Sequence, residues 1–414
     1  MNETMDDESY ARAALTYLAE PADRVLGALL RVHGAARTLE AIKAGGEDGA
    51  VAMCADGLAD GITADGIAPD VSAAADSLET GRVARSSVRR AIERWRVRLP
   101  ELPSPADVVA FGRSGIRLVC PGDPEWPSQL ADLGDAQPYA LWLRGSADLR
   151  FSCLRSVAIV GSRAASAYGC YVAAEFGASV AGRGWSVVSG AAAGIDVSAH
   201  RGALGSGGVT IAVLACGVDV PYPAAHEELL DAIAAQGVVV SEWPPGRQVS
   251  RLRFLVRNRV IAALATGTLV VEAAERSGAL NTARNARDLT RRLMAVPGQI
   301  TSDTSVGCHY IVREWQAVLV TSADEVMEHL SPVGAAPAVE SPGGRPVRPV
   351  LGRDALELEA ATVLDAMPRR GGMGITRIAQ RAGLPPATVL CRLGELAAGG
   401  FIERCEDGWR LPRR

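Results

Sequence analysis

The sequence is poor in lysine, in aromatic residues and in closely spaced cysteines. Lys43 is its single lysine, so cationic contacts depend on arginine, and aromatic residues make up only 5% of the chain. The eight cysteines include no CxxC pair, which argues against a zinc site, and we expect neither a metal nor another cofactor. No apolar run is long enough to span a bilayer, and the acidic start MNETMDDESY is unlike a secretion signal. We therefore expect a cytoplasmic protein without membrane contact.

The rest of the composition is that of a large globular chain. A sequence of 414 residues, 48% of them hydrophobic, is too long for one core and predicts two or three domains. Its net charge of −4 does not by itself indicate a nucleic-acid partner. A local basic patch can form on an acidic protein, so the placement of the arginines matters more than their sum.

Changes in pattern divide the chain into four segments. Residues 1–100 have helical periodicity and predict an N-terminal helical domain of the SAM or helix-hairpin-helix kind, whose role in packing, protein contact or nucleic-acid contact stays open. Residues 101–330 alternate apolar strands with helices. Residues 331–353 are rich in proline, glycine and alanine and predict a flexible linker. Residues 354–414 predict three helices and a hairpin, the pattern of a winged helix.

The predicted winged helix has two possible partners. Its third helix, residues 386–396, carries Arg392 as its only cation, and the hairpin turns at Asp407-Gly408 beside another acidic residue. A DNA-reading module and a protein-interaction module therefore remain equally open for this segment.

Residues 101–330 predict a doubly wound α/β domain, with a mostly parallel sheet and helices on both faces. The expected strands are Ile116–Val119, Ala140–Leu143, Val157–Val160, Trp185–Val188, Val209–Leu214, Val238–Val240, Thr268–Val271 and Leu293–Val296. In such sheets ligands bind at the carboxyl ends of the strands. The turns that follow these strands are therefore the candidates for a binding site.

Two glycine-rich turns end the first two core strands. One is Gly161-Ser162-Arg163, and the other begins at Ser189-Gly190. Small residues let backbone N–H groups approach an anion, the following helix N-termini add positive charge, and Arg163 offers a planar cationic fork. The dinucleotide fingerprint GxGxxG is absent, and similar turns also connect strands to helices without a ligand.

A second cationic segment surrounds Phe254. Arg251 lies just before it, and the helix predicted from residue 254 carries Arg257, Asn258 and Arg259 in its first turns. An aromatic ring among fixed cations suits a nucleic-acid strand, because a base can stack on the ring while the arginines hold phosphates.

These segments and the predicted helix start at Ser277-Gly278 should converge on one edge of the sheet. The candidate DNA- and phosphate-binding residues are Gly161, Ser162, Arg163, Ser189, Gly190, Arg251, Phe254, Arg257, Asn258, Arg259, Ser277 and Gly278. The alternative is that some arginines pair with Asp196, Glu242 or Glu272 to hold the loops. His200 and His226 lack a nearby nucleophile elbow, so we expect structural hydrogen bonds from them and no catalytic residue.

The order of these motifs resembles the DNA-processing protein A (DprA, also called Smf) family of bacteria. The matching motifs are Gly161-Ser162-Arg163, Ser189-Gly190, Gly194-Ile195-Asp196, Tyr222-Pro223, Phe254 with Arg257-Asn258-Arg259, Ser277-Gly278 and Pro297-Gly298. The resemblance covers roughly residues 115–320. It implies an extended Rossmann-like domain that binds single-stranded DNA without sequence preference, forms a homodimer and helps load the RecA recombinase during natural transformation.

A nucleotide-cleaving enzyme is the alternative function. Phosphoribohydrolases that act on nucleoside monophosphates have a similar Rossmann-like fold and carry a Pro-Gly-Gly-x-Gly-Thr-x-x-Glu motif. This chain lacks that motif, since Gln299 follows Pro297-Gly298. The sequence therefore favours a DNA-binding protein that is not an enzyme.

Overall fold

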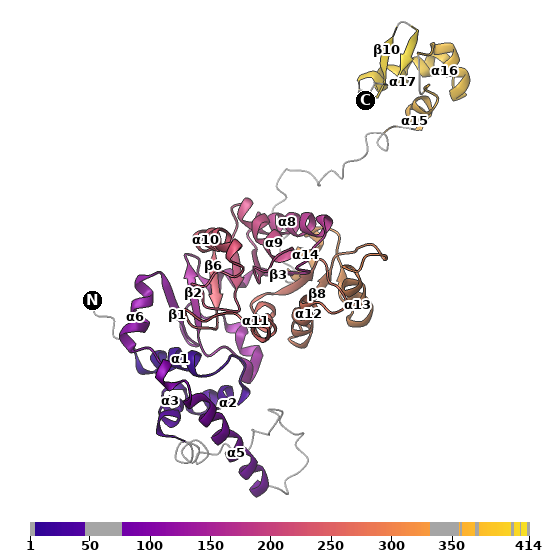
Figure 1. The fold of residues 1–414 in the computed structure, drawn as a ribbon. Coiled ribbons are helices and arrows are strands. Elements are labelled where there is room, and N and C mark those ends of the chain that lie inside the picture. The colour runs from indigo at the N-terminus through magenta and orange to yellow at the C-terminus, as the bar shows by residue number, and fades with distance from the viewer. Residues whose placement is uncertain are drawn as a thin grey trace. The chain divides into compact units, whose positions relative to one another are not determined.

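The structure, a computed structural model, describes residues 5–45, 77–331, 356, 358–368, 372–398, 401–405 and 407–411. The chain forms two compact units, Met1–Ala335 and Ala336–Arg414, which are described separately below (Figure 1). Apart from Ser331, the predicted linker lies outside the described residues, and the boundaries of the four predicted segments stay predictions. Within the described ranges no helix is long and apolar enough to cross a membrane.

The first unit begins with a layer of helices, as the periodicity predicts. These are α1 (Asp7–Leu18), α2 (Arg24–His33), α3 (Ala35–Ala44), α5 (Ser77–Arg96) and α6 (Pro105–Arg113), with the 3-10 turn η2 (Leu99–Glu101) before α6. Asp6, Asp23 and Ser104 cap three of the helix N-termini with their side chains. Leu29 and Ile42 are fully buried in the small core that α1, α2, α3 and α5 share.

The sheet of the first unit has nine strands. They are β1 (Ile116–Val119), β2 (Leu141–Gly145), β3 (Ser156–Val160), β4 (Ser186–Ser189), β5 (Thr210–Val213), β6 (Val238–Ser241), β7 (Gly267–Val270), β8 (Arg292–Ala295) and β9 (Val318–Leu319). Their order is β1-β2-β6-β5-β4-β3-β7-β8-β9. Of the strand pairs in this sheet, β1–β2 and β2–β6 are antiparallel and the other six are parallel, so the predicted mostly parallel sheet is confirmed. Short β9 was not predicted.

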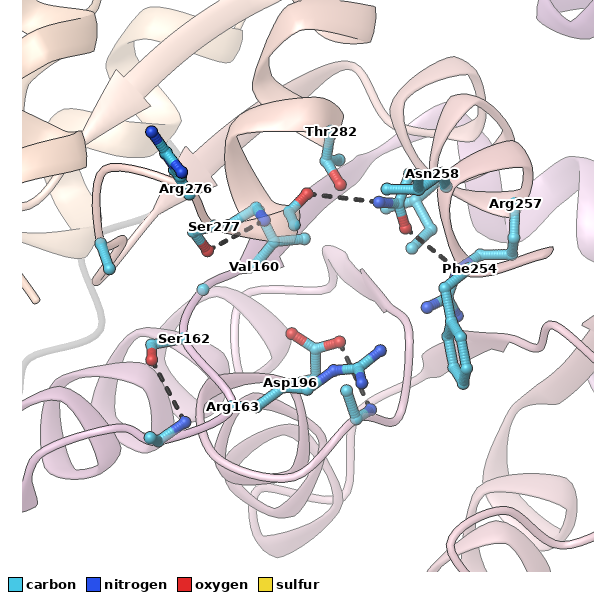
Figure 2. A pocket seen from close by; sticks show the side chains of 18 of the residues that line it. Val160, Ser162, Arg163, Asp196, Phe254, Arg257, Asn258, Arg276, Ser277 and Thr282 are labelled. Carbon is cyan, nitrogen blue, oxygen red and sulfur yellow. Dashed lines mark hydrogen bonds between the residues drawn. The ribbon is translucent and has the colours of Figure 1, made fainter. Parts of the chain in front are cut away.

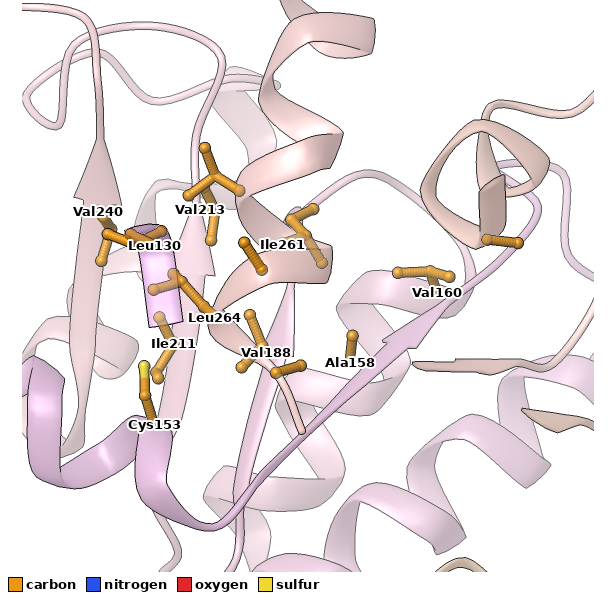
Figure 3. Packing of buried hydrophobic residues seen from close by; sticks show 14 of the residues in the cluster. Leu130, Cys153, Ala158, Val160, Val188, Ile211, Val213, Val240, Ile261 and Leu264 are labelled. Atoms are coloured by element: carbon orange, nitrogen blue, oxygen red, sulfur yellow. The ribbon is translucent and has the colours of Figure 1, made fainter. Parts of the chain in front are cut away.

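Helices cover both faces of this sheet, as predicted. They are α7 (Leu149–Leu154), α8 (Ala167–Ala181), α9 (Ile195–Gly205), α10 (Glu227–Gln236), α11 (Arg251–Leu264), α12 (Gly278–Asp288), α13 (Val306–Trp315) and α14 (Ala323–Leu330), with 3-10 segments η3 (Ser128–Ala136) and η4 (Ala224–His226). Strand residues alternate between the two faces. Val188 and Val213 point to one face and pack with Ile261 and Leu264 of α11 (Figure 3), whereas Val187 belongs to the core of the other face.

The strand order creates a switch point beside β3. From β3 the chain adds β4, β5 and β6 on one side, and α11 then carries it back to β7 on the other side. Connections that leave neighbouring strands in opposite directions open a crevice at their carboxyl ends, where ligands of doubly wound sheets bind. The turn after β3 and the turn after β7 form the two sides of this crevice.

The second unit is a small helical domain with a hairpin. Its elements are α15 (Leu358–Asp365), α16 (Ile375–Ala382), α17 (Pro386–Ala398) and the antiparallel pair β10 (Glu403–Cys405) and β11 (Gly408–Arg410). Val363, Ile378 and Leu393 are fully buried in its core. Arg392 pairs with both Glu359 and Glu395, so the cation of α17 is used inside this unit.

Candidate nucleic-acid interface

A pocket of about 720 Å³ lies at the switch point. We call it the switch-point pocket. Residues 160–164 at the end of β3, residues 274–282 after β7 and part of α11 between residues 251 and 261 line it (Figure 2). Most of the predicted site residues meet here, namely Gly161, Ser162, Arg163, Arg251, Phe254, Arg257, Asn258, Ser277 and Gly278. Three predicted residues, Ser189, Gly190 and Arg259, are not among the lining residues.

Close backbone contacts shape the wall formed by the first turn. The Ser162 N–H donates to the carbonyl of Glu272 at 2.8 Å, and the Ala164 N–H donates to Ser162 Oγ at 3.2 Å. A Cβ on Gly161 would come within 2.8 Å of that same carbonyl and closer still to Ile195, so a larger residue does not fit. The sequence needs glycine here because the two strand ends approach so closely.

The opposite wall is the start of α12. Ser277 caps this helix through a hydrogen bond from the Ala279 N–H at 3.2 Å, as the sequence predicts. The helix N-terminus therefore faces the pocket with its partial positive charge. Asn258 of α11 joins the wall, since its Nδ2 donates to the carbonyl of Gly278 and to Asn281 Oδ1, both at 3.3 Å.

Three exposed arginines line the switch-point pocket without an ion-pair partner among the described residues. They are Arg163, Arg251 and Arg276. The guanidinium of Arg163 lies 4.5 Å from the centre of the Phe254 ring, a cation–π contact that orders the side chain without neutralising it. The sequence prediction did not include Arg276. Its position directly before Ser277, the N-cap of a helix predicted to border the site, could have indicated it.

An aromatic pair forms another part of the pocket. Tyr222 contacts Phe254 with ring centres 5.6 Å apart and planes tilted by 50°. Tyr222 is 43% exposed, so one side of the pair faces solvent. The sequence prediction included Phe254 and left out Tyr222, because 31 intervening residues separate the two in the chain. The pocket thus combines ring surface with unneutralised positive charge.

Arg257 lies in the floor of the pocket and is buried. Its Nη1 donates to the carbonyl of Gly190 at 2.9 Å and to that of Val213, and its Nε donates to Asn258 Oδ1 at 3.2 Å. Burial lowers its pKa to about 10, although the charge of nearby Asp196 acts in the opposite direction. Arg257 therefore holds three segments together beneath the pocket.

Asp196 provides the negative charge below this floor. Its Oδ2 accepts the N–H of Gly190 at 3.1 Å and the N–H of Ala192 at 3.4 Å. Burial raises its pKa, even though Arg257 and these N–H groups favour the carboxylate. The Gly190 N–H donates to Asp196, and the Ser189 hydroxyl donates to the carbonyl of Ile159. Both donors are used inside the protein, so they are not available for the phosphate contact that the sequence suggested for this second turn.

Arg259 also has a different position from the one the sequence suggested. Helix α11 begins at Arg251 rather than at residue 254, so Arg259 lies in its third turn. There it points toward Glu242 after β6 and toward Ala136 at the end of η3. Its guanidinium makes two hydrogen bonds of 2.6 Å to Glu242 and another of 3.0 Å to the carbonyl of Ala136. Arg259 therefore forms an ion pair that holds a loop, the alternative that the sequence left open. The prediction that Arg259 contacts a phosphate is corrected accordingly.

Comparison with known proteins identifies the family. The model of the family described as DNA recombination-mediator protein A matches residues 117–331. The chain belongs to this family. A putative DNA processing protein DprA of Mycobacterium tuberculosis is 43% identical over 357 residues, which cover 82% of this chain and 87% of that protein. Protein Smf of Escherichia coli is 37% identical, with coverage of 71% and 77%.

The structural comparison agrees with this family membership. DNA processing protein A (DprA) of Streptococcus pneumoniae, known from an X-ray structure, matches with a TM-score of 0.52 and 34% identity over 61% of this chain and 86% of that chain. Residues 360–405 match the IclR helix-turn-helix domain, so the predicted winged helix is confirmed as a fold. The resemblance inferred from the sequence motifs is therefore correct.

The two histidines singled out in the sequence, His200 and His226, make hydrogen bonds inside the domain. The Thr210 hydroxyl donates to the carbonyl of Val187 at 2.8 Å, so its oxygen accepts from His200 Nδ1 at 2.7 Å and fixes that tautomer. Burial lowers the pKa of His200 to about 3, which keeps the ring neutral. His226 Nδ1 lies 3.0 Å from the carbonyl of Ala191. Both histidines therefore make the structural hydrogen bonds that the sequence led us to expect.

Proposed function

We propose that this chain binds single-stranded DNA, without base preference, in the switch-point pocket. The observation that carries the proposal is the contact between Arg163 and Phe254, because it places an unneutralised cation 4.5 Å from a ring in an open pocket. A base can stack on an aromatic surface whatever its identity, while arginine and helix N-termini hold the phosphates. Membership of a family whose relatives are named DNA processing proteins supports this function.

We also propose that the chain is not an enzyme. Glu272 beside the pocket accepts hydrogen bonds from the Ser166 hydroxyl at 2.5 Å and the Ser166 N–H at 2.9 Å, and Glu242 is paired with Arg259. Carboxylates held in this way are poorly placed to act as a general base on a nucleotide. A nucleotide-hydrolysis assay with product analysis tests the alternative, and release of a free base would establish the phosphoribohydrolase function instead.

Family membership supports two finer parts of the proposal. We propose that the chain acts in the cytoplasm as a homodimer and helps load a RecA-type recombinase onto the bound strand during natural transformation or recombination. Light scattering of the purified chain tests the dimer. Strand-exchange assays, with the recombinase blocked by a single-strand-binding protein, test loading, and no stimulation by this chain would contradict it.

Single-strand binding itself is tested by gel shift with matched single-stranded and duplex DNA. Affinity for the single strand should be the higher, should vary little with base composition and should fall with salt at a log–log slope of about −0.7 per neutralised phosphate. Preference for duplex, or binding that does not depend on salt, would contradict the proposal.

A further inference from the structure

Two exposed tyrosines lie on one face of α8, the helix that follows the first wall of the switch-point pocket. Tyr168 is 51% exposed and Tyr171 is 69% exposed. Residues three apart on a helix are neighbours on its surface, so the two rings form one patch. Neither ring is in an aromatic or cation–π contact with another described residue. Since each tyrosine is more than half exposed, a ligand can reach the rings.

The tyrosine patch is next to the pocket. Ala164 is the last pocket-lining residue of the first turn, and Tyr168 follows four residues later. Four residues span at most about 14 Å even when fully extended. The Tyr168 hydroxyl also donates to the carbonyl of Pro297 at 3.0 Å, and Pro297 follows the carboxyl end of β8. Tyr168 thus lies at the same edge of the sheet as the pocket.

Hydrogen bonds fix the patch relative to the pocket. The Glu272 side chain accepts from the N–H and hydroxyl of Ser166, which caps α8, while the Glu272 carbonyl accepts from Ser162 in the pocket wall. The bond to Pro297 further restricts the Tyr168 ring. A ligand that contacts both surfaces therefore meets groups that are already ordered, which lowers the entropic cost of binding.

The charges around the patch suit a nucleic-acid strand that arrives from the pocket. Arg163 and Arg276 lie exposed on the pocket side without ion pairs in the described structure. Glu175 lies exposed one turn beyond Tyr171, and its only hydrogen bond with a described residue comes from Ser179 at 3.4 Å. Because a carboxylate repels phosphate, the favourable surface runs from the arginines to Tyr171 and ends there.

We propose that Tyr168 and Tyr171 stack against the bases of a single strand whose phosphates occupy the switch-point pocket. This inference rests on the proposed single-strand binding and extends the site by a second segment along α8. The tyrosines give a base-independent contact, because every base has a flat π-face. They add length to the site without adding charge.

The test compares Tyr168→Ala, Tyr171→Ala and the double variant on oligothymidines of about four and about sixteen nucleotides. Affinity for the longer strand should fall at least about fivefold for each ring removed, whereas affinity for the shorter strand should hardly change. The salt slope should stay that of the parent, since stacking neutralises no phosphate. Alanine is a good helix former, so these exposed changes leave α8 intact.

Two further variants sharpen the comparison. Tyr168→Phe keeps the ring and loses only the bond to Pro297, so its affinity should remain close to that of the parent. Phe151→Ala is the matched control, because Phe151 is 71% exposed but lies on α7, before the amino end of β3 and at the opposite edge of the sheet. It should leave binding to either strand unchanged.

A fluorescent base reports stacking directly. An oligothymidine with one 2-aminopurine should show quenching at some position with the parent, and that quenching should be lost in the double variant. The inference is overturned if the tyrosine variants bind the longer strand as the parent does, if both lengths weaken equally, or if Phe151→Ala has the same effect. Failure of the parent to bind either length would instead refute single-strand binding itself, and the extension with it.

Discussion

Arg259 and Glu242 form a buried ion pair with two parallel hydrogen bonds, Nη1 to Oε2 and Nη2 to Oε1, both of 2.6 Å. The two side chains are only 8% and 3% exposed. Arg259 also donates to carbonyls of Ala136 and Val256, so its donors are used within the protein. The pair links the turn after β6 to α11, whose packing against the sheet through residues such as Ile261 and Leu264 also holds the helix in place.

Arg259→Ala should therefore lower stability rather than DNA affinity. Removing one partner of a buried pair leaves the other charge uncompensated, which typically costs about 3–5 kcal/mol. We expect a clearly lower melting temperature by calorimetry, while protein that is still folded at low temperature binds single-stranded DNA nearly as the parent does.

The double variant Arg259→Met with Glu242→Leu is the control for this prediction. Replacing both charges with apolar side chains of similar volume is often neutral, so much of the lost stability should return. If Arg259→Ala melts like the parent and binds DNA several-fold more weakly, Arg259 is a phosphate contact after all.

Arg257→Ala should combine a loss of stability with a loss of affinity. The substitution removes the donors to Gly190 and Val213 and leaves the Asp196 carboxylate without its cation. We expect a lower melting temperature together with weaker DNA binding, because the same residue supports the pocket floor. Melting and affinity measured on one preparation test this, and an unchanged melting temperature would show that Arg257 has no supporting role.

The sequence predicted the sheet better than the use of its arginines. Runs such as Val157–Val160 are apolar and short, and local composition alone identifies them as buried strands. The role of an arginine depends on its partner, and Arg259 takes one partner 17 residues away and another 123 residues away in sequence. No local pattern distinguishes it from Arg163, which has the same residue type but an exposed position. Tyr222 was missed for the same reason, since folding alone brings it to Phe254.

Glu20 should make part of the stability depend on pH. It accepts hydrogen bonds from Arg253 at 2.7 and 3.0 Å and from Trp243 Nε1 at 3.0 Å, and so joins the N-terminal helices to α11. Burial alone would raise its pKa, but these hydrogen bonds and the nearby arginines outweigh it and lower the pKa below 4.5. A carboxyl with a lowered folded-state pKa stabilises the protein above its unfolded pKa, and this contribution is lost as the pH falls.

Glu20→Gln should accordingly lower the melting temperature at pH 7 and reduce its decrease below about pH 4.5. The matched control is Glu40→Gln, because Glu40 pairs with Lys43 at the surface and is 72% exposed. It should leave the melting curve close to that of the parent at each pH. Equal curves for Glu20→Gln and the parent would mean that this link contributes no stability.

Removal of residues 340–414 should leave most of the single-strand affinity in place. The cation of α17, Arg392, is already paired with Glu359 and Glu395, so the second unit offers little unneutralised charge on that helix. We expect less than a tenfold loss, or about 1.4 kcal/mol, in gel-shift titrations. A larger loss would make the winged helix a principal DNA contact and decide the question of its partner.

Arg163→Ala gives the most direct test of the proposed site. The side chain is exposed, has no ion pair within the described structure and rests on the Phe254 ring, so its removal leaves no buried charge behind. Affinity for single-stranded DNA should fall alike for all base compositions, and the log–log salt slope should become less steep by about 0.7 if one phosphate contact is lost. The melting temperature should stay near that of the parent. Arg292→Ala is the matched control, because Arg292 is also exposed but begins β8 at the opposite edge of the sheet, and it should change neither quantity. If Arg163→Ala binds as tightly as the parent, or if Arg292→Ala weakens binding equally, the strand does not lie in the switch-point pocket even though the family assignment stands.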